Sequence, residues 1–429
     1  MTAVDRFERE LPDALADVAG MARPDYLSDI LGQTAATRQR PAWASLERWL
    51  PMDLVIPRAT VARVPWRAAF VLAALLLTIV LAALIAGSRQ QRVPPPFGPA
   101  ANGLISYGAN GDIFVGDPIT GESHLVVSGP ENDYGPMFSP DGTRIMFVRA
   151  APPGEDVYVV NLDGTDVHKL TAAPLVQFMT ATWTPRSDGI AVGYGVDPDA
   201  RFEVLDATGT AAPRLLLSND DVDWALYRPP AGDELLVRAR IGGIWGLYAM
   251  RPDGTDVRLL APQQNAAVGG GPPDQDLNFP AYSPDGTRIY FNWYVPEHET
   301  IEAWVMDADG SHRHPFKVAG SSPGWWEGEM VPSPDGRSVI MWRVPPSATA
   351  GGGHITVYPA DGSGPGREIP LTVSGTAIWG WSPDSTRVLL NYNDDNEGFE
   401  LLIDPETAAI IHVAWNAHAT PDWQRRATP

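Results

Sequence analysis

A Ser-Pro-Asp-Gly element recurs in the chain, and its serine and carboxylate are residue types that can do chemistry. It stands as FSPDGTRIMF at 138–147 and returns almost unchanged as YSPDGTRIYF at 282–291. A serine becomes a nucleophile when a base activates it, and in α/β-hydrolases it lies in a Gly-x-Ser-x-Gly turn. The segment GWSPD at 380–384 begins like that turn but ends in Asp384. We therefore do not expect a peptidase.

Two other groups of residues have the types that bind metal ions. His312 and His314 stand close together in DGSHRHPF, but no carboxylate or third histidine has a useful spacing from them, and zinc sites need at least three protein ligands. The segment NDDNEG at 393–398 resembles part of a calcium loop, but no glutamate closes it and it joins predicted strands rather than helices. The chain contains no cysteine. The sequence therefore predicts no metal site, no thiolate chemistry and no cofactor.

The Ser-Pro-Asp-Gly element is better explained as a turn. Proline presets φ to about −65°, aspartate bonds its own backbone two residues on, and glycine accepts positive φ. Apolar residues alternate on both sides of the element, as in β-strands. Weaker copies, WTPRSDGIAV at 183 and YRPPAGDELL at 227, lose the serine or shift the aspartate. A catalytic group would not tolerate such changes, so the element is predicted to join two strands.

The copies recur with a regular period through residues 101–429. They read FSPDGTRIMF at 138, WTPRSDGIAV at 183, YRPPAGDELL at 227, YSPDGTRIYF at 282, PSPDGRSVIM at 332 and WSPDSTRVLL at 381, with ATPDWQRR at 419 as a seventh, partial copy. The first six are each followed by a second strand-like run, and the seventh run of that kind lies at 105–127. The spacing averages about 47 residues, within the range of propeller repeats.

The seventh strand-like run lies at the start of the domain, whereas the seventh copy of the turn lies at its end, and this arrangement predicts how the ring closes. The strand near 418–424 would pair with the first strands at 103–127, so that both ends of the domain contribute to one sheet. The predicted fold class is all-β: a seven-bladed β-propeller of four-stranded blades whose closing blade is shared by both ends of the domain. A short α-helical N-terminal region and one transmembrane helix are predicted to precede it.

These repeats resemble those of the TolB-like, or WD40-like, β-propeller family, whose copies carry this Ser-Pro-Asp-Gly-x-x-Ile turn followed by a strand and an Asp-Gly turn. The resemblance covers residues 101–429. It implies a propeller that lies outside the cytoplasm and binds protein partners at one end of the ring. The layout also resembles membrane-anchored propeller proteins of high-GC bacteria, some of which are associated with sigma-factor regulation.

One long apolar segment divides the chain. Residues 68–87, AAFVLAALLLTIVLAALIAG, carry no charge, and a helix of that length spans about 30 Å, the hydrocarbon thickness of a bilayer. A cleaved signal peptide is the alternative, but 67 residues precede the segment. The predicted organisation is a helical segment at 1–67, the transmembrane helix at 68–87, a Pro-rich linker at 88–100 and the propeller at 101–429.

Arginines near the apolar segment predict its orientation. Arg58, Arg63 and Arg67 precede it, whereas Arg89 and Arg92 follow, and positive residues favour the cytoplasmic side. The acidic excess behind the formal net charge of −21 lies beyond Arg92. Nucleic acid is therefore not an expected partner, because phosphate contacts need a basic face. We expect a single-pass protein of the cell membrane with a cytoplasmic N-terminus and an extracytoplasmic propeller.

A binding site is expected where the loops that enter the innermost strands converge at the mouth of the ring. The candidate residues are Asp133, Tyr134, Asp223, Asp276, Trp325, Glu327 and His418. Carboxylates and aromatic side chains around one rim could bind a cation, a sugar or a basic peptide. The alternative is that the acids only solvate the rim and that Trp224 and Trp325 pack between blades.

Three functions fit these features. The leading hypothesis is a non-catalytic, membrane-anchored module whose propeller binds a protein or glycan at its mouth. The second is a transmembrane regulator whose residues 1–57, with helical spacing of apolar residues at 5–19 and 25–37, bind a cytoplasmic protein such as a sigma factor. The third is a propeller enzyme that acts on polysaccharide with carboxylates of the rim.

Overall fold

The computed structural model divides the chain into two units, residues 1–89 and 90–429. The residues that it describes are 70–78, 93–196, 198–263, 277, 279–295, 297, 300–316, 325–345, 353–373, 376–394, 397–415 and 419–428.

In the first unit, residues 70–78 are helical. They lie inside the apolar segment predicted to cross the membrane, and the rest of that segment and the predicted helical region at 1–67 are outside the described residues. Apolar side chains of this helix, including Phe70 at 70% and Leu77 at 68%, are largely exposed. Within the described part of the chain, no helix has both the length and the hydropathy needed to span a membrane.

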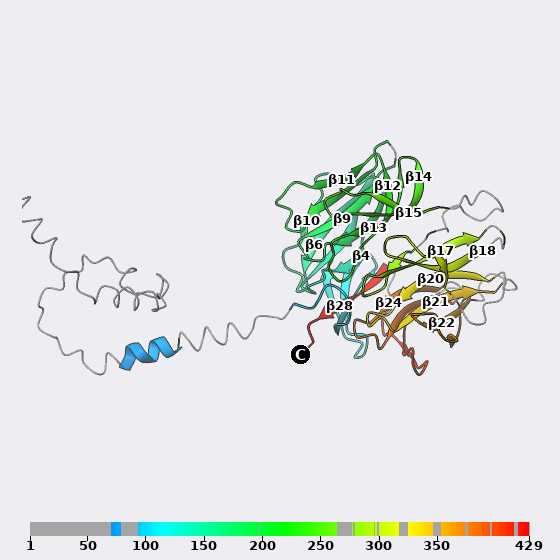
Figure 1. The fold of residues 1–429 in the computed structure, drawn as a ribbon. Coiled ribbons are helices and arrows are strands. Elements are labelled where there is room, and N and C mark those ends of the chain that lie inside the picture. Colours follow the sequence, from blue (N-terminus) through cyan, green and yellow to red (C-terminus); the bar gives the residue numbers. More distant parts are fainter. Residues whose placement is uncertain are drawn as a thin grey trace, which may run out of the picture. The chain divides into compact units, whose positions relative to one another are not determined.

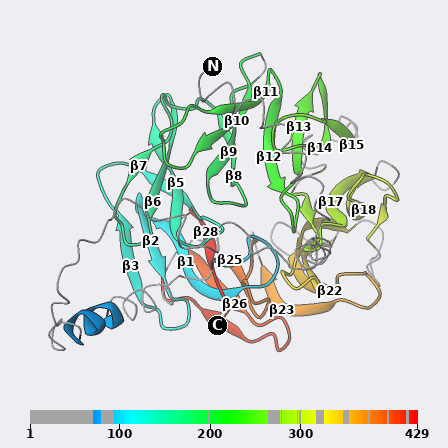
Figure 2. The same ribbon diagram turned by 60° about the vertical axis from the view of Figure 1, so that its left-hand side comes forward.

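The second unit is a ring of seven four-stranded antiparallel sheets, the blades (Figures 1 and 2). Blade 1 contains β28 (Ala419–Arg426), β1 (Ala101–Ala109), β2 (Asp112–Gly116) and β3 (Ser123–Val127). Blade 2 contains β4 (Asp133–Phe138), β5 (Arg144–Ala151), β6 (Gly154–Asn161) and β7 (His168–Lys169). Blade 3 contains β8 (Phe178–Trp183), β9 (Gly189–Tyr194), β10 (Arg201–Asp206) and β11 (Arg214–Ser218).

Blade 4 contains β12 (Asp221–Tyr227), β13 (Leu235–Ile241), β14 (Ile244–Met250) and β15 (Arg258–Pro262). Blade 5 contains β16 (Ala281–Tyr282), β17 (Arg288–Val295), β18 (Thr300–Asp307) and β19 (His314–Pro315). Blade 6 contains β20 (Trp326–Pro332), β21 (Ser338–Val344), β22 (Gly353–Pro359) and β23 (Arg367–Val373). Blade 7 contains β24 (Thr376–Trp381), β25 (Val388–Asp394), β26 (Glu397–Ile403) and β27 (Ile410–His412).

The predicted closing blade is confirmed. The last strand, β28, pairs antiparallel with β1, and Ile105 lies opposite Trp423. The side chain of Gln424 accepts a hydrogen bond from the Leu104 backbone N–H at 3.1 Å and donates one to the Gly142 carbonyl of blade 2 at 2.7 Å. Both ends of the domain are thus joined in one sheet, which is also tied to the next blade.

One detail of the repeat alignment was wrong. The segment ATPDWQRR was aligned as a seventh copy of the turn, but Pro421 and Asp422 lie inside β28. The aromatic Trp423 is buried, as is Phe138 at the end of β4 immediately before the turn of blade 2. The segment therefore corresponds to the innermost strand that leads into a turn, and the second strand of that blade is supplied by β1.

The first six copies of the turn, including the two weaker ones, join the first and second strands of their blades. In blade 2 the Ser139 hydroxyl donates to Asp141 Oδ1 at 2.6 Å and accepts from the Arg144 N–H at 3.0 Å. The fourth position has positive φ, 70° at Gly142 and 64° at Ser385, which glycine adopts without strain. The serine and the aspartate therefore hold the hairpin, as the turn interpretation predicted.

These turns are also linked from blade to blade. The Asp141 N–H donates to Ser187 Oγ of blade 3 at 3.1 Å, and the Asp384 N–H donates to Asn102 Oδ1 of blade 1 at 3.1 Å. Indole groups also link neighbouring blades: Trp183 Nε1 of blade 3 donates to the Met137 carbonyl of blade 2 at 3.1 Å. The turns and the aromatic residues before them thus set the spacing of the blades.

Residues 93–100, which we call the strap, lie against the propeller at the end that carries these turns. Pro94 and Ala100 are buried, and the Ala100 N–H donates to the Pro383 carbonyl at 2.9 Å. The sequence predicted that these residues belong to a Pro-rich linker at 88–100, ahead of the propeller. Their contacts show that the described part of that linker packs on the ring.

Candidate binding site at the propeller mouth

The two ends of the ring differ in the length of their connections. At the turn end, residues 139–143 suffice to join β4 to β5. At the opposite end, which we call the mouth, the chain enters each innermost strand, and residues 263–280 connect β15 to β16. Binding residues are often found on long loops that a rigid scaffold positions, so the mouth is the structural candidate for a site.

The acids predicted at the mouth are paired with arginines on the neighbouring strand. Asp133 and Arg149 are cross-strand partners in β4 and β5, and Arg149 Nε and Nη2 donate to the two carboxylate oxygens at 2.6 and 2.7 Å. Only 1% of the Asp133 side chain is exposed. This arrangement is a bidentate ion pair, in which charge-assisted hydrogen bonds are strong.

Blade 6 repeats this arrangement with a glutamate. Glu327 and Arg343 are cross-strand partners in β20 and β21, with Arg343 Nε 3.8 Å from Glu327 Oε1. The second oxygen, Oε2, accepts from the Ala303 N–H of blade 5 at 2.8 Å. Arg343 Nη1 donates to the Tyr358 hydroxyl at 2.9 Å. Glu327 therefore joins two blades.

Blade 4 carries two such pairs. Asp221 accepts from Arg240 Nε at 2.8 Å, and Asp223 Oδ2 lies 3.3 Å from Arg238 Nη2. Burial raises the pKa of Asp223, while the positive charge of Arg238 opposes that shift. Across these three blades the rim acids are held in ion pairs rather than presented to solvent.

The predicted aromatic residues also have structural contacts. The ring of Trp325 lies 4.6 Å from the Arg343 guanidinium and 5.5 Å from the His354 ring. Trp224 Nε1 donates to the Pro280 carbonyl of the connection into blade 5 at 3.2 Å, as expected if it packs between blades. The Tyr134 hydroxyl donates to Glu155 at 3.4 Å, and burial with this nearby carboxylate raises the pKa of Tyr134.

Of the seven predicted site residues, Asp276 and His418 lie outside the described residues. Trp325 and Glu327 occur together in blade 6, whereas Asp133 and Tyr134 begin β4 and Asp223 lies in β12. Each acid is engaged within its own part of the rim. The structure therefore does not unite the described candidates in one pocket, and their role in binding stays a prediction.

Sequence reasoning missed the arginine partners, although the repeats contain the signal. Arg149, Arg238 and Arg343 stand at the same offset from the first residue of their turns. In a hairpin, residues equally far from the turn on its two strands lie side by side. A β-bulge shifts this register in β4 and β20, and with that shift the acid ahead of the turn and the arginine after it become a cross-strand pair.

Exposed apolar side chains at the mouth were also missed. They lie on the connections or at the strand ends of blades 3, 4 and 5 and are between 41% and 52% exposed: Val176, Met179, Val196, Ile244 and Phe279. The Gly195 N–H donates to the Val176 carbonyl at 2.9 Å, which holds two of these loops together. Phe279 meets the ring of Trp224 edge-on at 5.4 Å. We call these five residues the apolar rim.

Two carboxyl groups on innermost strands have strongly raised pKa values. Burial raises the pKa of Glu329 in β20 to about 7. It raises the pKa of Asp422 in β28 to about 6, although the Phe138 N–H donates to this carboxylate at 2.7 Å. At neutral pH the inner strands therefore carry less negative charge than the sequence suggests.

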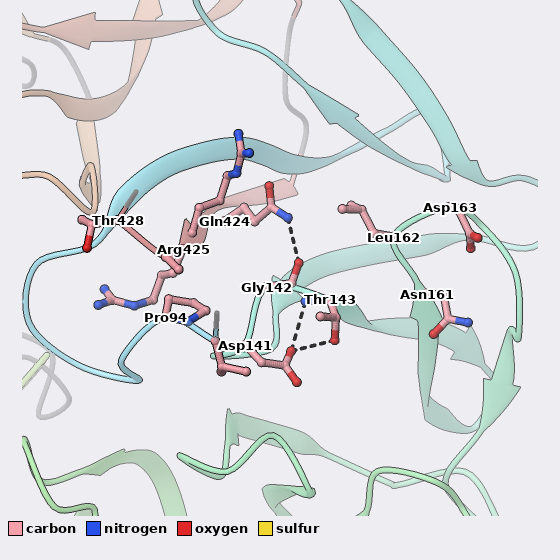
Figure 3. A pocket seen from close by; sticks show the side chains of 13 residues that line it. Pro94, Asp141, Gly142, Thr143, Asn161, Leu162, Asp163, Gln424, Arg425 and Thr428 are labelled. Atoms are coloured by element: carbon pink, nitrogen blue, oxygen red, sulfur yellow. Dashed lines mark hydrogen bonds between the residues drawn. The ribbon is translucent and has the colours of Figure 1, made fainter. Parts of the chain in front are cut away.

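A cavity of about 840 Å³ opens at the turn end, away from the mouth (Figure 3). Strap residue Pro94, Asp141 of the first turn, Asp163 and Arg425 are among its lining residues. The Asp141 carboxylate is occupied by hydrogen bonds within its turn. Among the described residues, no group of three or more His, Asp or Glu side chains could hold a metal ion.

The sequence of the chain has a curated relative. Over 163 residues it is 31% identical to the Tol-Pal system protein TolB of Anaeromyxobacter dehalogenans (strain 2CP-C), a match that covers 36% of this chain and 33% of that protein. The propeller is TolB-like. The match spans only about a third of the relative's length, and no family model matches the chain.

Solved structures resemble the TolB-like propeller in fold. Oligogalacturonate lyase from Vibrio parahaemolyticus aligns with 73% of this chain and 84% of its own, with a TM-score of 0.51 and 11% identity. TolB from Acinetobacter baumannii aligns with 75% of this chain and 81% of its own, with a TM-score of 0.46 and 15% identity. The likeness to the lyase shows the fold alone.

The mouth of the TolB-like propeller thus combines two kinds of surface. Among the described residues, the acids that the sequence predicted at the rim form ion pairs with arginines. Its apolar rim exposes side chains that a soluble protein usually covers. Such a surface can exclude water around a partner that brings complementary apolar groups.

Proposed function

We propose that the TolB-like propeller is a non-catalytic module that binds a protein partner at its mouth. The observation that carries this proposal is the apolar rim, because its five exposed side chains lie on connections or strand ends at one end of the ring. Apolar side chains at the centre of an interface supply much of the binding energy. The ion-paired acids support the same function by fixing the hairpins on which the rim stands.

The charge of the mouth favours a basic partner. The exposed acids Glu131, Asp199 and Glu297 lie on its connections, and the chain as a whole has a formal net charge of −21. The arginines Arg149, Arg240 and Arg343 are engaged with acids. A segment that carries lysine or arginine beside apolar residues would match both features of this surface.

A protein partner suits the mouth better than a glycan or a polysaccharide substrate. Trp325 lies against Arg343 and beside His354, so its ring is not a free platform for a sugar. Glycoside hydrolysis commonly uses two available carboxyl groups, whereas both oxygens of Asp133 accept hydrogen bonds from Arg149. These contacts support the binding module over the propeller enzyme.

Peptide binding tests this proposal. A peptide of alternating lysine and leucine is expected to bind the full-length protein, with an affinity that falls as salt increases, and its glutamate counterpart is expected to bind far more weakly. Phe279→Ser and Met179→Ser should each weaken binding about tenfold, because each removes apolar contact. Fluorescence anisotropy with labelled peptides measures both effects.

The matched control is Leu125→Ser, because Leu125 is 53% exposed on β3, an outermost strand. This variant should bind the cationic peptide like the wild type. Equal losses in all three variants, or equal binding of both peptides, would contradict the proposal. If the wild type instead cleaves an oligosaccharide and Asp133→Asn abolishes this activity, the propeller enzyme would be supported.

We also propose that residues 68–87 anchor the propeller in the cell membrane, with the N-terminus in the cytoplasm. The described residues 70–78 support an anchor because they form a helix whose large apolar side chains are exposed. Protease added to intact cells should then digest the propeller and leave residues 1–67 protected. Recovery of an undigested propeller, or of the whole protein in the soluble fraction, would count against the anchor. Whether residues 1–57 bind a cytoplasmic partner such as a sigma factor stays a prediction.

A further inference from the structure

The strap crosses the axis of the ring at the turn end. Its eight residues, 93–100, span at most about 28 Å when fully extended. Over that length, Pro94 lines a cavity with the first turn of blade 2, and Pro99 lines another with the turns of blades 5 and 6. Phe97 packs against the core cluster of blades 3 and 4. A short segment that reaches blades on opposite sides of a ring must lie over its centre.

The strap is bonded to the strand that closes the ring and to blade 7 beside it; we call the pairing of β28 with β1 the seam. Arg425 of β28, in blade 1, donates from Nε to the Pro95 carbonyl at 3.2 Å and from Nη2 to the Gly98 carbonyl. The Ala100 N–H donates to the carbonyl of Pro383, in the turn of blade 7. The strap therefore fastens blade 7 to blade 1 from outside the sheets.

The arginine contact is partly buried, with its bond to Pro95 exposed and its bond to Gly98 partly buried. Burial lowers the pKa of Arg425, and the nearby Asp422 carboxylate opposes that shift. A guanidinium group removed from water needs hydrogen-bond acceptors in the protein, and two strap carbonyls provide them. Without the strap, the Arg425 guanidinium would lose both of these carbonyl acceptors.

Phe97 anchors the strap between blades 3 and 4. Its ring packs against the cluster that includes Leu235 and Tyr248. It also lies close to Gly232, whose backbone has positive φ and stands against Pro185 of blade 3. Phe97 directly precedes Gly98, whose carbonyl accepts from Arg425, so this anchor fixes the part of the strap that Arg425 contacts.

We propose that the strap is a latch: its anchor at Phe97 holds Arg425 of β28 and thereby keeps β28 paired with β1, which closes the ring. A change in the chain that precedes residue 93 would then alter closure of the ring. The latch is a conformational device of the propeller and does not depend on which partner the mouth binds.

Hydrogen exchange of the full-length protein tests the latch through Phe97→Ala. This variant removes a side chain near blades 3 and 4, yet the amides of β1 and β28 should exchange about tenfold faster, equivalent to about 1.4 kcal/mol. Arg425→Lys keeps the charge but loses the two-pronged contact, and it should raise exchange in the same two strands. Mass spectrometry of peptides from blades 1, 4 and 7 measures the effect.

Leu217→Ala is the matched control, because Leu217 packs against the same cluster as Phe97 but lies on β11 rather than on the strap. Its effect should stay in blades 3 and 4. Faster exchange confined to blades 3 and 4 in Phe97→Ala would overturn the latch, and so would an equal effect of Leu217→Ala at the seam. Should Arg425→Lys fail to fold, Phe97→Ala and its control still decide the question.

Discussion

Deletion of residues 419–429 is expected to abolish cooperative unfolding of the propeller. These residues include the whole of β28, which supplies the innermost strand of blade 1 and the buried side chains of Trp423 and Gln424. The deletion would also expose an edge of β1. Loss of one buried tryptophan side chain alone typically costs about 3–5 kcal/mol, and a whole domain is stable by only about 5–15 kcal/mol.

Thermal unfolding followed by circular dichroism measures this loss. The matched control stops after Arg426, so that it loses only residues 427–429 and keeps every residue of β28. It should melt within about 2 °C of the full chain, because those residues lie outside the sheet. A truncated protein that lacks β28 but melts cooperatively at the full-length temperature would refute closure by the shared blade.

Asp133→Ala is expected to destabilise the propeller by about 3–5 kcal/mol, because it leaves the partly buried Arg149 without its bidentate partner. Arg149 would retain its weaker contacts with the rings of Tyr158, at 4.6 Å, and Phe147, at 5.7 Å. Adding Arg149→Met should recover much of the loss, because the unpaired charge is then gone. Chemical denaturation of the single and double variants measures both steps.

Glu131→Ala serves as the comparison, because Glu131 is an exposed acid two residues earlier on the same connection. It should change stability by less than about 0.5 kcal/mol. If Asp133→Ala instead folds with wild-type stability and loses partner binding, Asp133 is a ligand residue, as the sequence analysis predicted, and not a structural one.

The fold was predictable because the turn that joins the first two strands of a blade repeats along the sequence. The turn at Ser139 has local chemistry that survives in weaker copies, so counting those copies predicted the blades. The unpaired run at 105–127 predicted where the ring closes. The misplaced copy at 419 shows the limit of this method, because proline and aspartate also occur inside β28.

The site was less predictable because its contacts depend on pairing and burial. Asp133 could be read as a rim acid from its position, but its charge is neutralised by a residue on the next strand. Phe279 and Met179 belong to no repeated pattern, so only the structure identifies them as exposed. The strap has no periodicity, and its contact joins Pro95 to Arg425, separated by 330 residues in the chain.

The shared blade also imposes an order on folding. Six blades are each built from one continuous stretch of chain, so each can form from local hairpins as it is synthesised. Blade 1 cannot, because its Leu104–Gln424 hydrogen bond joins residues 320 positions apart. Until the last strand emerges, β1 presents an unpaired edge to other chains. The first strand of the propeller to be synthesised, β1, is therefore the last to acquire both of its neighbours in the sheet.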